Sequence, residues 1–282
     1  MRIATWNVER LKHRKRLDNI QAACQATNAD ILVLTETDQT IHTDYPYQIH
    51  TEHPHDSKWS IYKDSERRVS ILTRYPCLRQ HDTFDAETAV CAELDTDIGP
   101  LLVYGTIIGI YGNRRPSFLE DLKKQIEDFK RLSAIGSLCI CGDFNCSFAD
   151  NYYFTTEGRK LMTEAFYQCG LCLLTHSVKQ GIDHIVFPYR HLAANRAQIF
   201  EWNTDKSLSD HKGVGVDISK KKLFSDRRWT DPPYTIVTGH QEVPIEDRLR
   251  ALDFWLEKKI MSPEEYQKRK NELLKLHDDD SD

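Results

Sequence analysis

Amide and carboxylate side chains follow short apolar runs at several points along this chain. The first such cluster is Thr5-Trp6-Asn7-Val8-Glu9, and the second is Leu34-Thr35-Glu36-Thr37-Asp38. Because alternate side chains of a strand face the same side, Asn7 and Glu9 are able to act together. Oxygen ligands of this kind suit a hard cation such as Mg²⁺ or Mn²⁺ better than zinc. A strand that ends in Glu is usually only solvated, so the prediction of a metal site depends on further clusters.

A third cluster, Cys141-Gly142-Asp143-Phe144-Asn145, again places a carboxylate and an amide on one face of a strand. Gly142 permits a close approach of the backbone just before them. Asp143 is suited to holding or deprotonating a water molecule, and Asn145 to donating to a phosphoryl oxygen as negative charge builds on it. This cluster is a much more specific signal than the first two.

Two Asp-His pairs follow this cluster along the chain, Asp183-His184 and Asp210-His211, both beside apolar strands. A neutral His needs a partner on one ring nitrogen to fix its tautomer, and a second Asp nearby supplies that partner. One such dipeptide is commonplace in proteins. Two of them, in order after the Gly-Asp-Phe-Asn cluster, indicate a functional site.

Taken together, the clusters resemble the endonuclease/exonuclease/phosphatase superfamily over about residues 1–218. The matching motifs, in the superfamily's order, are Thr-Trp-Asn-Val-Glu, Leu-Thr-Glu, Gly-Asp-Phe-Asn, Ile-Asp-His-Ile and Ser-Asp-His. The superfamily includes abasic-site endonucleases, DNase I-like nucleases, tyrosyl-DNA phosphodiesterases, sphingomyelinases and inositol-phosphate phosphatases. The resemblance implies a four-layered α/β sandwich, in which two packed, mainly antiparallel sheets are flanked by helices. It also implies a phosphodiesterase that depends on Mg²⁺ or Mn²⁺.

The resemblance further implies which residues hold the metal ion. The expected metal ligands are Glu36, Asn7, Asp210 and Glu9. Among them Glu36 is the principal ligand, with Asn7 and Asp210 close to the ion. Glu9 stands where the superfamily has an Asp, and it is expected to reach the ion directly or through water.

The resemblance also implies the catalytic residues, Asp143, Asn145, Asp183 and His211. Asp143 is expected to orient or activate the attacking water, and Asn145 to stabilise the transition state. His211, oriented by Asp183, is expected to contact the scissile phosphate and to help neutralise it.

The chain departs from the superfamily in the strand Leu102–Ile108. Many members carry a second catalytic His here, and abasic-site enzymes carry a Tyr, whereas this chain has Thr106 in the approximate position. The acid that protonates the leaving group therefore stays open. Tyr111 and Asn113 in the following loop are candidates, and so is His184.

Basic residues lie near the expected edge of the site, in Lys12-His13-Arg14-Lys15-Arg16 and in Asn113-Arg114-Arg115. Lys and Arg there are able to hold flanking phosphates of a nucleic acid, with Trp59, Tyr62 or Tyr153 for stacking. The alternative interpretation is an ordinary solvated helix start and loop. The expected substrate-binding residues are Arg14, Arg114, Arg115, Asn113, Tyr111 and His184.

Three functions are compatible with these residues. We expect a nuclease that hydrolyses DNA or RNA, ahead of a phosphatase or phosphodiesterase acting on a small or lipid-derived phosphate ester. The third, an inactive binding scaffold, is disfavoured because the principal site residues are intact. The sequence does not distinguish DNA from RNA, or cutting within a strand from cutting at its end, because fold-level resemblance does not settle substrate.

The elements that position these clusters alternate between strands and helices, which is typical of a layered α/β domain. The predicted strands are Ile3–Trp6, Ile31–Thr35, Ser70–Thr73, Ala89–Leu94, Leu101–Ile108, Leu138–Cys141, Leu171–Leu174, Ile182–Phe187 and Gly213–Ile218. The predicted helices of the main domain are Arg16–Thr27, Ser117–Leu132 and Arg159–Gln168.

A change in composition divides the chain near residue 218. We expect a linker over 219–244, a helical hairpin over 245–277 and an acidic tail over 278–282. The hairpin has too few apolar residues for a core of its own, so it must pack on itself, on the main domain or on another chain. A homo-oligomer or a partner protein held through the hairpin is therefore one expectation.

Composition is that of an ordinary soluble protein, with 40% hydrophobic and 29% charged residues and a net charge of −5. No apolar run approaches the roughly 20 residues that span a bilayer, so no membrane partner is expected. The first residues enter a strand pattern at once, and we expect a cytoplasmic protein. The 8 cysteines are expected to be reduced, and Cys169 and Cys172 to diverge at Gly170 rather than to form a metal or redox pair.

Overall fold

The computed structural model describes residues 1–56, 60–192, 195–220, 245–259 and 261–279. Its strands form two six-stranded sheets, in the orders β11-β12-β1-β2-β4-β3 and β5-β6-β7-β8-β10-β9. The strands are β1 (Arg2–Asn7), β2 (Ile31–Asp38), β3 (Tyr47–His50), β4 (Glu66–Thr73), β5 (Cys77–His81), β6 (Ala89–Thr96), β7 (Gly99–Ile107), β8 (Ser137–Asp143), β9 (Leu171–Leu173), β10 (Asp183–Pro188), β11 (Asn195–Trp202) and β12 (Gly213–Lys220). The helices are α1 (Leu17–Ala26), α2 (Ser117–Ile135), α3 (Thr156–Gln168), α4 (Ile245–Glu257) and α5 (Pro263–Asp279), with short 3-10 turns at Glu9–Leu11, Arg14–Arg16 and Tyr189–His191.

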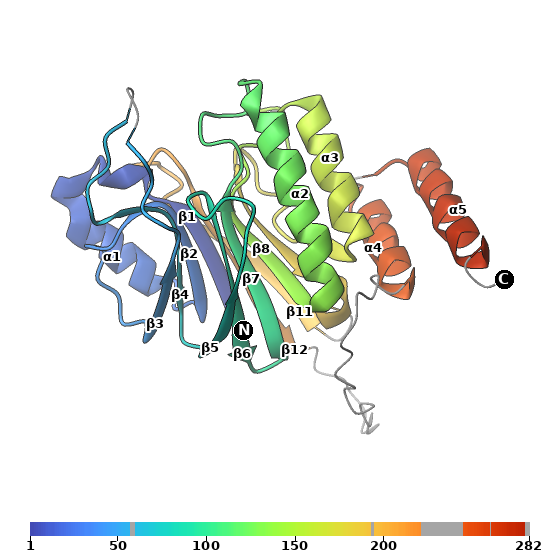
Figure 1. Cartoon of the computed structure of the whole chain (residues 1–282), viewed down its shortest axis with the longest axis horizontal. Helices are drawn as coiled ribbons and strands as arrows, with labels where there is room; N and C mark the ends of the chain where they lie inside the picture. The colour runs from blue at the N-terminus through green and yellow to red at the C-terminus, as the bar shows by residue number, and fades with distance from the viewer. Residues whose placement is uncertain (57–59, 193–194, 221–244, 260, 280–282) are drawn as a thin grey trace.

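The two sheets pack face to face and are covered by helices on their outer sides, α1 on one and α2 with α3 on the other (Figure 1). Strand β8 shows how the sequence produces this arrangement, because its residues are buried on both faces. Leu138 and Ile140 face the helices, whereas Cys139 and Cys141 face the other sheet. Successive side chains of a strand point to opposite faces, so such a strand reads as a continuous apolar run. The four-layered sandwich expected from the sequence is confirmed.

Two parallel strand pairs bring the acidic clusters to one edge of the sandwich. Strands β1 and β2 are parallel and are connected through α1, with Asn7 beside Thr35. Strands β7 and β8 are parallel and are connected through α2, with Ile107 beside Asp143. Parallel strands joined by a helical crossover end at the same side of their sheet. Glu36 and Asp143 are therefore carried to the same edge from different sheets.

The predicted strands and helices are all present, with bounds that differ by a few residues. Strands β3, β5 and β11 were not predicted. Strand β11 carries Phe200 and Trp202, whose rings lie over Gly215 and Gly213 of β12; a Cβ on these glycines would approach the rings to 2.1 and 1.9 Å. The aromatic residues of this strand are accommodated by glycines in its partner, which is a pairing between distant parts of the chain.

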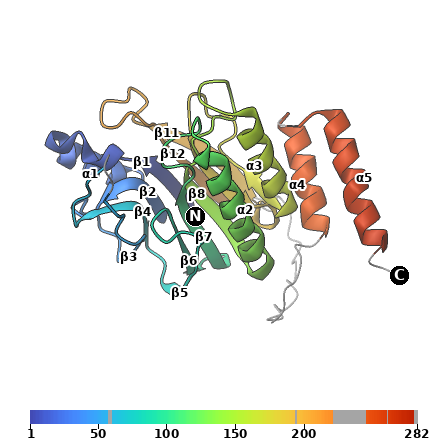
Figure 2. The ribbon, with the colours of Figure 1, turned by 45° about the horizontal axis from the view of Figure 1, so that its top comes forward.

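The two C-terminal helices lie beside α3, with α4 next to it and α5 outermost (Figure 2). Trp255 of α4 is fully buried, stacks on Phe166 at 6.4 Å between ring centroids and donates from Nε1 to the Leu171 carbonyl at 3.3 Å. Arg269 of α5 binds the Glu164 carboxylate at 2.7 Å. Of the packing alternatives open to the hairpin, the structure shows docking on its own chain. Residues 221–244 of the expected linker and 280–282 of the expected tail lie outside the described residues.

All eight cysteines are free. Cys169 packs with the helix-covered core and Cys172 with the core between the sheets, because Gly170 turns the chain with a φ of +64° between them. The sequence expectation that this pair diverges is confirmed. In the described part of the chain, no helix is both long and apolar enough to cross a membrane.

Candidate active site

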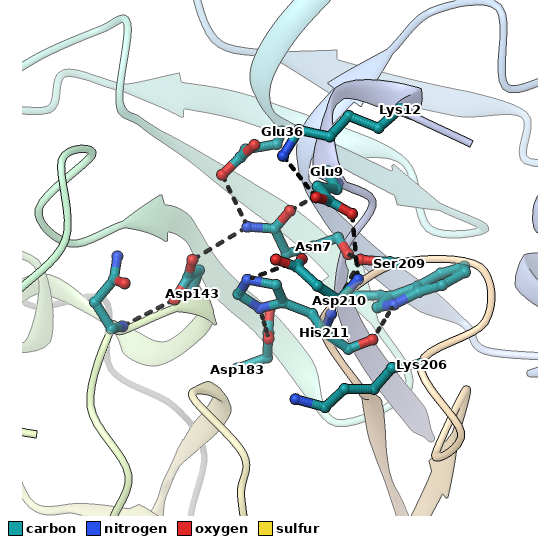
Figure 3. A network of polar contacts seen from close by, with 12 residues as sticks. Asn7, Glu9, Lys12, Glu36, Asp143, Asp183, Lys206, Ser209, Asp210 and His211 are labelled. Carbon is teal, nitrogen blue, oxygen red and sulfur yellow. Dashed lines mark hydrogen bonds and ion pairs between the residues drawn. The ribbon is translucent and has the colours of Figure 1, made fainter. Parts of the chain in front are cut away.

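The amide of Asn7 connects the two sheets at the edge where β1, β2 and β8 end (Figure 3). Its Nδ2 donates to Glu36 Oε1 at 3.2 Å and to Asp143 Oδ2 at 3.1 Å. Its Oδ1 accepts from the backbone N–H of Glu9 at 2.8 Å. Asn7 is fully buried, so this bridge holds the carboxylates of Glu36 and Asp143 close together.

His211 is held by a charged hydrogen bond with Asp183, 2.6 Å from its Nδ1. Burial alone would lower the pKa of His211, but the negative charge of Asp183 and the hydrogen bond to it raise that pKa to about 10. The ring is therefore an imidazolium at neutral pH. Its Nε2 lies 3.7 Å from Asp210 Oδ1, beyond a direct hydrogen bond, and this N–H remains available to a ligand.

Asp143 lies opposite Asp183 on the neighbouring strand β10 and is almost fully buried, with 3% of its surface exposed. Burial raises the pKa of Asp143 to about 7; the positive charge of His211 opposes this rise, whereas the charges of Asp183 and Glu36 add to it. One oxygen of Asp143 also accepts from the backbone N–H of Asn145 at 2.8 Å. A carboxyl group that titrates near neutral pH is suited to general-base catalysis.

The backbone around these residues is unusual in ways that only particular residues tolerate. Gly142 has a φ of +141°, and a Cβ there would lie 1.9 Å from the Thr106 carbonyl oxygen. Glu36 and Asn145 have φ values of +46° and +48°, in the left-handed region that costs ordinary residues of order 1 kcal/mol. Such conformations concentrate at functional sites. The close approach that the sequence suggested for Gly142 is present.

The loop that carries Asp210 and His211 is fixed by hydrogen bonds to its backbone. The His211 carbonyl accepts from Trp6 Nε1 at 3.1 Å and from Asn203 Nδ2 at 2.7 Å. The hydroxyl of Ser209 donates to the Asn7 carbonyl at 2.6 Å. Sequence reasoning missed the part played by Asn203, because an Asn in a loop gives no local sign of the distant carbonyl that it will bind.

Two expected roles are corrected by the structure. The amide nitrogen of Asn145 donates to the carbonyls of Ile108 and Gly109, both at 3.1 Å, so it is engaged with the backbone rather than free to donate to a phosphoryl oxygen. His184 is fully buried. Its Nε2 donates to the Cys146 carbonyl at 2.8 Å and its Nδ1 accepts from the Thr175 hydroxyl at 2.9 Å. A ring enclosed in this way does not fit the expected contact with substrate or the expected protonation of a leaving group.

The other predicted substrate-binding residues lie in different surroundings. Asn113 is buried and donates to the Asn145 carbonyl at 2.7 Å, whereas Tyr111 is 59% exposed. Arg114 and Arg115 are exposed, and the Arg114 guanidinium lies 6.0 Å from the Tyr153 ring centroid. The side chain of Arg14 lies outside the part of the chain that is described.

The residues expected to stack, and Thr106 at the position of the superfamily's second His, lie in separate surroundings. Trp59 lies outside the described residues, and the Tyr62 ring lies under the Arg10 guanidinium at 4.2 Å. Thr106 is buried and donates to Gln125 of α2 at 2.6 Å, so it faces the helix layer. Tyr153 lines a cavity of about 250 Å³ beside His211 and Asp183.

That cavity also contains residues that the sequence did not single out. Tyr152, Lys206 and Lys212 line it together with Asp183, Asp210 and His211. Tyr152 comes from the loop between β8 and α3, and both lysines from the segment between β11 and the start of β12. The cavity is thus bounded by loops from both sheets, which explains why no single stretch of sequence predicted it.

The donors at this edge suit a hard divalent cation. Glu36, Glu9 and Asp210 offer carboxylates around the amide of Asn7 (Figure 3). Within the described ranges, no group of three or more His, Cys, Asp or Glu side chains is arranged to hold a metal ion, so these donors form an open arrangement rather than a preformed site. Mg²⁺ fits such an open arrangement, because it usually keeps several waters and takes only one or two protein carboxylates.

Comparisons with known proteins agree with this geometry. Among solved structures, the chain is similar to an endonuclease/exonuclease/phosphatase from Beutenbergia cavernae DSM 12333, with a TM-score of 0.57 and 15% identity over 78% of this chain and 71% of that one. It is also similar to the endonuclease domain of TRAS1, a telomere-specific non-LTR retrotransposon, with a TM-score of 0.55 and 17% identity over 79% of this chain and 99% of that one. A third similar structure is an AP endonuclease from Archaeoglobus fulgidus, with a TM-score of 0.53 and 13% identity over 77% and 99% of the two chains.

At these identities the solved structures show the fold alone. A comparison with curated proteins found no match. The model of the Endonuclease/Exonuclease/phosphatase family matches residues 4–211, a span that contains every motif from Asn7 to His211. This match covers well over half of the sequence, and the chain therefore belongs to the Endonuclease/Exonuclease/phosphatase family.

Proposed function

We propose that this chain is a divalent-metal-dependent phosphodiesterase that hydrolyses the phosphodiester bonds of a nucleic acid. The observation that carries the proposal is the pair formed by Asp143 and His211. Asn7 Nδ2 holds the Asp143 carboxylate at 3.1 Å, and Asp183, directly opposite Asp143 on β10, holds the His211 ring at 2.6 Å. A base for water and a cation for a phosphate oxygen are what hydrolysis of a phosphodiester requires.

Each residue of the site has a distinct part in this proposal. Asp143 accepts a proton from the attacking water, and the backbone N–H of Asn145 orients its carboxylate. His211 donates from Nε2 to a phosphate oxygen, and Asp183 keeps the ring charged and oriented. Of the candidates for the leaving-group acid, Tyr111 alone has a side chain open to solvent.

Four residues would hold the metal ion, and they are Glu36, Asn7, Asp210 and Glu9. The Asn7 nitrogen donates to Glu36 in this structure, so Asn7 acts first by fixing that carboxylate. When bound, the ion would offset the charge of the phosphodiester and stabilise the leaving oxygen. A nucleic-acid substrate is supported by two of the similar structures, which are described as endonucleases.

The test is hydrolysis of labelled single- and double-stranded DNA and RNA with Mg²⁺ or Mn²⁺, for the wild type, Asp143→Asn, His211→Gln and the surface control Lys130→Ala. We expect metal-dependent cutting that each site substitution lowers by about 10²-fold or more and that the control retains. Cutting that survives both site substitutions would refute the assignment of the site. Hydrolysis of small phosphate esters alone would refute the choice of substrate, and inactivity on all substrates would favour the binding scaffold.

A further inference from the structure

Lys206 and Tyr152 meet across the cavity that contains His211. The Lys206 Nζ lies 3.1 Å from the Tyr152 hydroxyl and 4.9 Å from the centroid of its ring. The two residues come from the loops after β11 and after β8, which belong to different sheets. Their contact therefore joins loops of the two sheets at the wall of the cavity.

The position of Lys206 relative to His211 is fixed by the loop between them. Lys206 has a φ of +55° and donates from its backbone N–H to the Asn203 carbonyl at 3.0 Å. The Asn203 side chain accepts from the backbone N–H of Leu208 at 2.9 Å and donates to the carbonyls of Ser209 and His211. The left-handed backbone conformation costs a Lys free energy. The surrounding hydrogen bonds hold the Lys206 backbone in this conformation.

Lys206 differs from the other lysines near the site in having no acidic partner among the described residues. Lys12 forms an ion pair with Glu9 at 2.6 Å, and Lys212 one with Glu201 at 3.2 Å. Among the described residues, the ammonium of Lys206 contacts Tyr152 alone, at its neutral hydroxyl and at its ring. A Lys ammonium has three N–H donors, so two remain for a ligand. Lys206 thus places an uncompensated positive charge in the cavity.

His211 and Lys206 lie at different positions, each of which suits one phosphate of a strand. Lys206 and Lys12 lie on opposite sides of the cluster formed by Asn7 and His211 (Figure 3). In the proposed function the reacting phosphate contacts His211. Lys206 lines the same cavity beside the ring of Tyr152, a residue that is 50% exposed. A cation beside an exposed aromatic ring is the combination by which proteins hold the backbone and an unpaired base of a single strand.

We propose that Lys206 binds the phosphate next to the cleaved phosphodiester and that Tyr152 stacks on the adjoining base. The substrate class is then a nucleic-acid strand with successive phosphodiesters and an unpaired base at this point, rather than a lone phosphate ester. This inference rests on the proposed function, because it takes the phosphate at His211 as the one that reacts.

The experiment is binding rather than cutting, so that it does not depend on catalysis. Fluorescence anisotropy of a labelled short single-stranded oligonucleotide, in EDTA, gives the Kd between about 50 and 200 mM salt. The proteins compared are the wild type, Lys206→Ala, Lys206→Arg, Tyr152→Ala and the control Lys130→Ala, whose charge lies on α2 and is paired with Glu127. Competition by inorganic phosphate is measured in parallel.

We expect Lys206→Ala to weaken binding of the strand about tenfold at the lowest salt and to reduce the log–log salt slope by about 0.7, the value for one phosphate contact to a single strand. Lys206→Arg is expected to restore most of the affinity, and Lys130→Ala to match the wild type. Tyr152→Ala is expected to weaken binding at least fivefold with little change in slope, because stacking carries no charge.

Equal affinity and equal slope for the wild type and Lys206→Ala would overturn the inference, as would failure of the wild type to bind the strand at about 50 mM salt. A loss of phosphate competition as large as the loss of strand binding would also overturn it, because Lys206 would then contact the reacting phosphate. A strand that binds through Lys206 but is not cut when Mg²⁺ is added would refute the proposed hydrolysis and leave the Lys206 site standing.

Discussion

Asp143 and Asp183 occupy directly opposed positions on the antiparallel strands β8 and β10. Two like charges in this relationship repel each other, yet each carboxylate has a different partner. Asp183 is paired with His211 at 2.6 Å, and Asp143 accepts from Asn7 at 3.1 Å. The two buried carboxylates therefore differ. Asp183 is stabilised by the cation of His211, whereas Asp143 keeps a pKa close to neutral pH.

Replacing Asp183 with Asn removes the charge that holds His211 as a cation while keeping a side chain of the same size. The proposed function predicts that kcat for a phosphodiester falls by about 10²–10⁴-fold, the range for loss of a positioned acid–base group. Steady-state kinetics would measure this, with Asp217→Asn as the control, because Asp217 is partly exposed and pairs with Arg2 on the other sheet. A loss confined to KM would contradict the prediction.

Binding of Mg²⁺ should stabilise the folded protein, because an ion that binds only the native state shifts the unfolding equilibrium. We expect Tm to rise with Mg²⁺ concentration for the wild type and to return to its starting value with EDTA. Glu36→Gln should remove most of this rise, and Glu127→Gln, an exposed substitution on α2, should not. An equal rise for Glu36→Gln and the wild type, in thermal unfolding followed by circular dichroism, would argue against Glu36 as the principal ligand.

Gly142 offers a test of how strongly the close backbone approach at this residue limits the side chain that the folded protein can accept. Gly142→Ala forces a Cβ to within 1.9 Å of the Thr106 carbonyl oxygen, whereas Gly99→Ala meets nothing within 4 Å although Gly99 also has a positive φ of +94°. We expect the first substitution to destabilise the protein by more than about 3 kcal/mol and the second by about 1–2 kcal/mol. Urea unfolding would measure both, and equal losses would mean that strain at positive φ, not the clash, dominates.

His184 makes stability depend on pH in the acidic range. Burial lowers the pKa of His184 to about 4, against about 6.5 in an unfolded chain. Between these values the unfolded chain binds a proton that the folded chain excludes. The contribution of neutral His184 to the free energy of unfolding is therefore fully present above about pH 6.5. As the pH falls toward 4, the free energy of unfolding decreases by about 3 kcal/mol from this residue.

His184→Gln keeps a neutral polar side chain and should flatten this dependence, although it lowers stability at pH 7.5 through poorer hydrogen bonding. Urea unfolding between pH 7.5 and 4.5 would test this, with the exposed His42→Gln as the control. The same pH slope for His184→Gln and the wild type would show that other groups cause the acid sensitivity.

Much of the site was predictable because its residues stand at the ends of strands with local sequence signals. Asn7, Glu36 and Asp143 meet because two helical crossovers bring parallel strands to one edge, and that geometry follows from the order of elements. His211 joins them from the loop before β12, which is antiparallel to β1. The position of His184 was also within reach of the sequence. Adjacent residues of a strand face opposite sides, so an Asp183 that faces His211 places His184 in the helix-covered layer.

The rest of the site depends on contacts that no local pattern encodes. Lys206 and Tyr152 are 54 residues apart, and their meeting depends on how two loops from different sheets close over the cavity. Asn203 donates to the backbone carbonyls of Ser209 and His211. Every residue type has such a carbonyl, so the sequence gives no sign of this contact. Strand β11 was missed for a related reason, since its rings fit only because glycines lie opposite them in β12.

The hydrogen bond from Trp255 to Leu171 has a consequence for how this chain behaves in solution. Leu171 belongs to β9, the outermost strand of its sheet, and an outermost strand with free backbone groups is a template for pairing with another extended chain. Helix α4 packs against β9, and the indole of Trp255 donates a hydrogen bond to the Leu171 carbonyl of that strand. The C-terminal hairpin thus covers this edge against the addition of another strand. A chain that lacks the residues from Ile245 onward would expose β9 as an aggregation-prone edge strand.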